Sequence, residues 1–187
     1  LYDIIAIRLA GIELSTDALT GKTSFEQPEF IEAAKKLQEF VNAGGINNDF
    51  LGIDWNEAQE QFIQGNGAML FNGTWTAGTI EKYESQVKGK VIAVKFPIIQ
   101  GGKGNNTEYF GGANDCIEVF AKTKYKEQSV KVAKYLAEGM AREGYLTGTG
   151  LPAWKIDEVD TSKLNPLLTQ QFNMIKDSTS YITWWDV

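Results

Sequence analysis

The stretch Phe62-Ile-Gln-Gly-Asn-Gly-Ala-Met-Leu-Phe-Asn-Gly-Thr-Trp75 decides the fold of this chain, because its glycines mark changes of secondary structure. Its first two glycines predict the end of a helix, since glycine accepts the backbone conformation of a C-terminal cap. The apolar run at 67–71 predicts a short buried strand. Gly73 then predicts a sharp turn that places Thr74 and Trp75 between a strand and a helix. In α/β folds, ligands bind at such junctions.

The rest of the chain extends this α/β prediction. We expect a small mixed sheet with helices on both faces and strands at 67–71, 91–98 and 115–121. Apolar spacing, capping residues and N-terminal prolines predict helices at 1–10, 28–43, 54–64, 75–83, 125–139 and 166–177, the first ended by Gly11. Asp54 and Glu57 resemble a capping box. The glycine-rich segment 100–107 is predicted to be a mobile loop.

Composition excludes several classes of function. The 187 residues are 43% hydrophobic and carry a net charge of −6, without a basic stripe, so nucleic acid is not an expected partner. There is no histidine, which excludes Ser-His and Cys-His catalytic pairs and His-ligated metal sites. The single cysteine, Cys116, lies in an apolar context and is interpreted as a small hydrophobe. We expect no metal, no cofactor and no catalytic residue.

Residues 1–187 are predicted to form a single domain that is truncated at both ends. The chain starts at Leu1 inside a predicted helix and ends in an aromatic cluster without a capping segment. We therefore interpret it as an excised piece of a longer protein, whose leader sequence and remaining parts are not included.

Two further stretches contain candidate binding residues. In Tyr109-Phe-Gly-Gly-Ala-Asn114, the paired glycines predict either a β-bulge or bare backbone beside a ligand, at Gly111 and Gly112, with Asn114 close by. The segment 179–187 contains adjacent tryptophans, which a free surface would rarely expose. Either these tryptophans pack onto other parts of the protein or one of them contacts a ligand. The candidates in this segment are Trp184, Trp185 and Asp186, and Trp154, which follows Pro152, is either a pocket wall or a loop anchor. Trp75 is either a core anchor of its own helix or a ligand contact.

The opening stretch also carries the pattern Phe-x-x-Gly-x-x-Ala-Met-x-x-x-Gly-x-Trp, which resembles the signature of the extracellular solute-binding proteins of ABC importers, sugar-binding type. The resemblance covers most of the chain and implies the second, C-terminal lobe of a type II periplasmic-binding-protein fold. In that family the glycine pair borders the sugar, and an aromatic residue near the position of Trp184 or Trp185 stacks on a sugar ring.

The resemblance implies a function as well as a fold. It implies a monomeric, non-enzymatic receptor that closes two lobes over a sugar or oligosaccharide and delivers it to an ABC permease. Such a receptor is extracytoplasmic, either periplasmic or lipid-anchored at the outer face of the membrane. Tryptophan platforms with convergent polar groups suit sugar recognition.

Two alternatives remain open at this stage. One is a glycosidase with paired carboxylates, such as Asp115 with Glu118 or Asp186. The other is a surface glycan-binding module without a role in transport.

Overall fold

The computed structural model describes residues 1–82, 84–112, 116–153 and 160–183. By its internal contacts the chain divides into two compact units. The first unit comprises Leu1–Glu60, Val94–Gly112 and Met174–Val187, and the second comprises Gln61–Ala93 and Ala113–Asn173. Each unit is described by itself below. The prediction that residues 1–187 form one lobe of a two-lobe protein stays a prediction.

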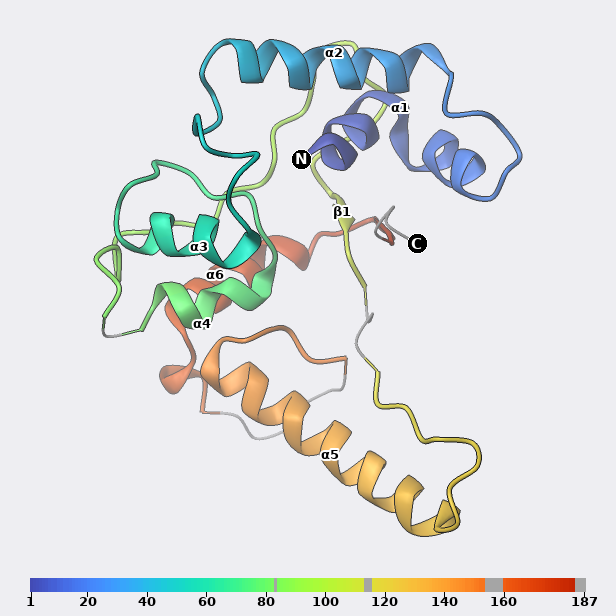
Figure 1. Cartoon of the computed structure of the whole chain (residues 1–187), viewed down its shortest axis with the longest axis vertical. Coiled ribbons are helices and arrows are strands. Elements are labelled where there is room, and N and C mark those ends of the chain that lie inside the picture. The colour runs from blue at the N-terminus through green and yellow to red at the C-terminus, as the bar shows by residue number, and fades with distance from the viewer. Residues whose placement is uncertain (83, 113–115, 154–159, 184–187) are drawn as a thin grey trace. The chain divides into compact units, whose positions relative to one another are not determined.

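Helices dominate the described residues (Figure 1). The elements in chain order are α1 (Tyr2–Leu19), α2 (Pro28–Asn42), α3 (Trp55–Ile63), the 3-10 helix η1 (Thr74–Thr76), α4 (Ala77–Ile80), β1 (Glu108–Phe110), α5 (Lys126–Thr147), the 3-10 helix η2 (Thr161–Lys163), α6 (Pro166–Ile175) and β2 (Ser180–Ile182).

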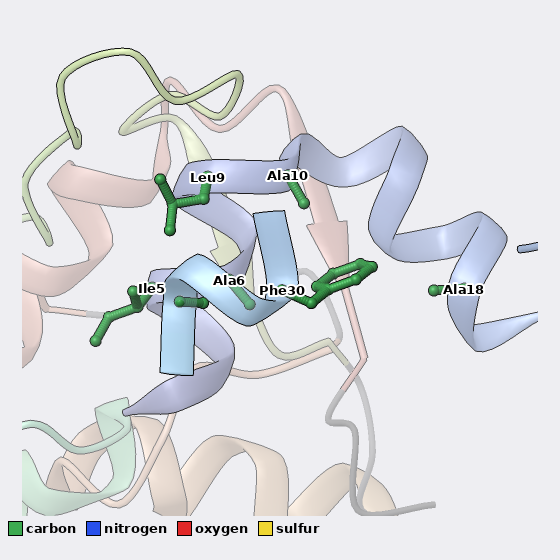
Figure 2. Close-up of a cluster of buried hydrophobic side chains, with 7 residues drawn as sticks. Ile5, Ala6, Leu9, Ala10, Ala18 and Phe30 are labelled. Atoms are coloured by element: carbon green, nitrogen blue, oxygen red, sulfur yellow. The ribbon is translucent and has the colours of Figure 1, made fainter. Parts of the chain in front are cut away.

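The core of the first unit lies between α1 and α2, which run side by side (Figure 1). Figure 2 shows the ring of Phe30 extending from α2 toward the two halves of α1, and this ring is almost fully buried. Burial of such side chains is the main driving force of folding. The cluster consists of Ile5, Ala6, Leu9, Ala10, Ala18, Phe30 and Ala33.

Gly11 interrupts α1, as the sequence predicted. Its φ of 76° and ψ of 167° are not helical, and a second helical stretch follows it and runs to Leu19. The kink interrupts the helical ladder, and the carbonyls of Arg8 and Leu9 accept hydrogen bonds from outside the helix. The N–H of Lys103 donates to Leu9 at 3.0 Å and the N–H of Gly104 donates to Arg8 at 3.1 Å. The predicted loop at 100–107 is therefore docked on α1 by its backbone.

The strongest helix predictions are confirmed. α2 begins at Pro28, and Glu32 and Lys36 form an ion pair one turn apart, at 3.4 Å. The capping box at α3 is complete, because the N–H of Asp54 donates to Glu57 and the N–H of Glu57 donates to Asp54, each at 2.9 Å.

The core of the second unit brings α3, α4 and α6 together. Its buried members are Phe62, Ala77, Ile80, Leu167 and Leu168. Asn165 joins two of these helices. Its Oδ1 accepts from the N–H groups of Leu167 and Leu168 at 2.9 and 3.0 Å, and its Nδ2 donates to the carbonyl of Ala77 at 3.0 Å.

The predicted strands are wrong for the described residues. In the described ranges, strands occur only at β1 and β2, which form a parallel pair instead of a mixed sheet. The segment at 91–98 does alternate, since Val91 and Ala93 pack on the second core while Ile92 is 72% exposed. However, the N–H of Ala93 donates to the side chain of Gln170 instead of to a neighbouring strand. Strand character requires a backbone partner as well as the right pattern.

Three further predictions of burial are also wrong. Met69, in the predicted buried strand, is 82% exposed, and Cys116 is exposed. The apolar spacing that predicted the helix at 125–139 also implied an inward face, but among the described residues no side chain of α5 is buried, and Val130 and Leu136 of that face are each 42% exposed. The reason is that α5 reaches the second core through its last turns, at Tyr145, and not along its length.

Candidate ligand-binding site

The parallel pairing of β1 and β2 defines one sheet edge at which candidate residues meet. Tyr109 is opposite Tyr181 in the register, and the N–H of Gly111 extends the ladder by donating to the carbonyl of Ile182 at 3.0 Å. Because the strands are parallel, both carboxyl ends lie at the same edge. Gly111 and Gly112 follow β1, and Thr183 follows β2. Ligands of α/β proteins bind at this kind of edge.

The glycine pair has a backbone that other residues rarely adopt. Gly111 has φ 126° and Gly112 has φ 138°. Among the described residues, a Cβ built on Gly111 would meet no atom within 4 Å, so none of them covers the main chain there. This geometry supports the prediction that the two glycines expose bare backbone.

Arg8 supports β1 from the side of α1, and sequence reasoning missed it. Its side chain is buried, with Nη1 donating to the carbonyl of Glu108 at 3.0 Å and Nη2 donating to that of Phe96 at 3.5 Å. Burial lowers the pKa of Arg8, and the nearby Glu108 opposes that shift. The only indication of this role in the sequence was that Arg8 is the single cation within an apolar run. Arg8 thus fixes the start of the strand that leads to Gly111.

The other face of the two strands carries aromatic and charged side chains that were also missed. The rings of Tyr109 and Tyr181 lie 6.2 Å apart, tilted by 33°. Lys95 pairs with Asp177, Nζ to Oδ2 2.6 Å. This hydrogen bond is the main reason that the pKa of Lys95 is raised. Burial raises the pKa of Tyr109 against the effect of Lys95, so the Tyr109 hydroxyl is neutral at physiological pH.

The second unit presents Trp75 in η1. The Trp75 side chain is 42% exposed, which disfavours its interpretation as a core anchor. Its ring lies against Gly73, where a Cβ would collide with it. The buried hydroxyl of Thr76 donates to the carbonyl of Gly73 at 2.8 Å and holds the turn, while Thr74 is half-buried. The sequence thus correctly predicted a tight glycine turn that presents an indole.

The predicted site residues fall into three groups. Gly111 and Gly112 belong to the first unit, and the three residues from Gly73 to Trp75 belong to the second. The others lie outside the described residues: Asn114, Trp154, Trp184, Trp185 and Asp186. Convergence of the three groups in one cleft stays a prediction.

Two open hollows do not involve these residues. One, of about 550 Å³, lies beside α2 and is lined by Glu29, Glu32, Lys35 and Lys103 among others. The other, of about 420 Å³, lies along the first turns of α5. Within the described part of the chain, acidic side chains and cysteine form no group of three that would suit a metal ion. No helix of that part is long and apolar enough to cross a bilayer.

Comparison with known proteins finds sequence similarity to extracellular binding proteins. The sequence model described as bacterial extracellular solute-binding protein matches residues 7–140. A probable sugar-binding periplasmic protein of Brucella suis is 27% identical over 101 residues, which are 54% of this chain and 22% of that protein. An uncharacterized ABC transporter extracellular-binding protein of Pyrococcus horikoshii is 24% identical over 156 residues, which are 82% of this chain and 33% of that protein.

Two solved structures share the fold. One, from a study of xylan utilization by the thermophilic bacterium Caldanaerobius polysaccharolyticus, is 46% identical with a TM-score of 0.96 over 99% of this chain and 48% of that chain. A chitin oligosaccharide binding protein is 22% identical with a TM-score of 0.76, over 98% of this chain and 45% of that chain. The present chain thus spans about half the length of these structures, and a smaller share of the curated relatives.

Proposed function

Because the chain belongs to the family of bacterial extracellular solute-binding proteins, we propose that it is part of a carbohydrate receptor that delivers oligosaccharides to an ABC importer. The receptor is non-catalytic and monomeric. It acts outside the cytoplasm, in the periplasm or anchored by lipid at the outer face of the membrane. Its partner there is the membrane-embedded permease.

The shared edge of β1 and β2 is the observation that supports this proposal most directly. It joins the open backbone of Gly111 to the strand that precedes Trp184 and Trp185 in the sequence. Backbone groups and tryptophan rings are what sugar recognition requires, since a sugar has hydroxyl groups around an apolar C–H face. Further proposed contacts to the sugar come from Gly73, Thr74, Trp75, Asn114, Trp154 and Asp186.

Xylan-derived oligosaccharides are the first ligand class to test. The protein from the study of xylan utilization is 46% identical over nearly the whole of this chain. Chito-oligosaccharides are the second class, because of the chitin oligosaccharide binding protein that shares the fold. Both are neutral polymers of six-membered sugar rings, which suits an aromatic platform.

Closure of two lobes is the proposed mechanism. One lobe, of type II periplasmic-binding-protein architecture, binds the sugar first, and the second lobe then closes and excludes water. For closure to signal occupancy, the ligand must bind the closed form more tightly than the open form. The permease then distinguishes loaded from empty receptor by shape.

The test is a fluorescence titration of the full-length protein with xylo- and chito-oligosaccharides. We expect a saturable change in tryptophan emission with one series. Trp75→Ala should weaken binding by at least about tenfold, as for a central aromatic contact. Trp55→Ala is the matched control, because Trp55 is similarly exposed, at 49%, but lies on α3 and is not one of the predicted site residues.

Two results would contradict the proposal. Absence of binding to every sugar tested would remove the carbohydrate assignment. Steady release of reducing ends from the same oligosaccharides would indicate a glycosidase instead of a receptor. Tight binding by the wild type with equal affinity in Trp75→Ala would retain the receptor but exclude Trp75 from its site.

A further inference from the structure

The exposed face of the β1–β2 pair forms a compact aromatic surface that contains none of the predicted site residues. Tyr109 and Tyr181 are register partners, so their side chains project from the same face of the sheet. Glu108 and Ile182, their neighbours on the strands, are buried on the opposite face. Tyr181 is 50% exposed, so much of its ring is accessible to a second molecule.

Hydrogen bonds hold both rings in place. The hydroxyl of Tyr109 donates to the carbonyl of Met174 at 2.9 Å. The hydroxyls of Tyr181 and Ser178 are 2.6 Å apart and share a hydrogen bond. A ring fixed in this way loses little conformational entropy when a ligand stacks on it, and this preorganisation favours binding.

Charged groups beside the rings cancel one another. Lys95 and Asp177 form an ion pair at 2.6 Å, and Asp177 remains 58% exposed. The pair offers ammonium donors and carboxylate acceptors without a net charge. Such a surface suits a neutral ligand rich in hydroxyl groups better than it suits an anion or a cation.

The position of this face relates it to the proposed site. Gly111 follows Tyr109 by two residues, and no described residue covers it on the side where a Cβ would lie. A chain of sugar rings that contacts the backbone of Gly111 therefore has the two tyrosines within reach along the same strands.

We propose that Tyr109, Tyr181, Lys95 and Asp177 form an outer subsite for a neutral oligosaccharide, which we call the tyrosine platform. A sugar ring stacks on the accessible side of Tyr181, and its hydroxyls bond to Lys95 and Asp177. This inference rests on the proposed function and adds to it a residue set that favours longer oligosaccharides over short ones.

The test compares ligands of two lengths on the full-length protein. Calorimetric titrations use xylobiose and xylohexaose, with chitobiose and chitohexaose measured alongside. Tyr181→Ala should weaken binding of the hexasaccharide about tenfold and change binding of the disaccharide by less than about twofold. Tyr181→Phe keeps the ring and should stay within about threefold of the wild type for both lengths. Tyr135→Ala is the control, since Tyr135 is 78% exposed on α5.

A second substitution guards against a loss of folding. Lys95→Met keeps both tyrosines and removes only the ammonium donor. It should therefore lower hexasaccharide affinity by about threefold to tenfold. Unchanged hexasaccharide binding in both Tyr181→Ala and Lys95→Met would overturn the platform. So would an equal loss for both ligand lengths, because an outer subsite acts only on the longer ligand. If the wild type binds neither sugar series, the proposed function fails first.

Discussion

Asn165 has two structural roles, as the cap of α6 and as a link to Ala77, and substitutions at this residue can separate them. Its Oδ1 caps α6 by accepting from the N–H groups of Leu167 and Leu168, and its Nδ2 donates to the carbonyl of Ala77. Loss of an N-cap costs about 1 kcal/mol, and loss of a part-buried neutral hydrogen bond costs about 1 kcal/mol more. The carbonyl of Ala77 keeps the N–H of Glu81 as a partner at 3.1 Å, so no further penalty is added.

Asn165→Ala should therefore destabilise the start of α6 by about 2 kcal/mol. Hydrogen exchange of the Leu167 and Leu168 amides in the full-length protein measures this opening directly, and about 2 kcal/mol corresponds to exchange about 30-fold faster. Asn165→Asp keeps an acceptor for the cap and loses only the donor to Ala77. It should accelerate exchange about fivefold, for about 1 kcal/mol.

Asn173→Ala provides the control, because it makes the same substitution at an exposed position of α6. Its effect on these two amides should be small. Equal acceleration in Asn165→Ala and Asn165→Asp would refute the separate contribution of the cap. Acceleration below about twofold in Asn165→Ala would refute the whole assignment.

Three shorter predictions concern the remaining contacts. Glu57→Ala removes half of the capping box of α3 and should lower the free energy of unfolding by about 0.5–1 kcal/mol, while Glu57→Gln restores most of it in denaturant titrations. Gly104→Ala drives a Cβ into a carbonyl oxygen of α1 and should cost about 1–3 kcal/mol in the same assay; a neutral effect would contradict the docking of this loop. The pKa of Glu29 lies below its ordinary 4.5, chiefly because Lys103 hydrogen-bonds to it, so this stabilisation is present above that pH and is lost as the pH falls through the lower folded value. Lys103→Met should therefore flatten the fall in Tm between about pH 5 and about pH 3, and an unchanged slope would exclude the pair as its source.

Local signals in the sequence were sufficient to predict most of the helices. Pro28 at the first turn of α2, the capping box of α3 and Asn165 before α6 all act within a few residues of the helix that they start. Gly11 shows both what local reasoning supplies and what it misses. Its positive φ interrupts the helix, as the sequence predicted, and the carbonyls freed at this break accept hydrogen bonds from the N–H groups of 103 and 104. These donors are some ninety residues distant in the sequence, so no local pattern indicates them.

The strand predictions were wrong for a related reason. The β-branched alternation at 91–98 is real in its burial, but no described segment pairs with its backbone, and the two observed strands have only three residues each. A parallel pair needs a partner brought back by a long connection, and β1 and β2 are separated by α5 and α6. The hydrophobic pattern alone therefore predicted strands in the longer apolar runs and missed the two short segments that pair.

This same pairing explains which part of the candidate site the sequence could supply. Gly111 and Gly112 were recognisable because their backbone excludes other residues, and such a requirement is local. Tyr109 and Tyr181 were not, because a tyrosine becomes part of a platform only when another strand places a second ring 6.2 Å away. The residues that fix this register, among them Arg8 beneath β1, act across about a hundred positions of the chain. Sequence reasoning therefore finds residues with unusual individual requirements, whereas residues defined by their neighbours emerge only from the fold.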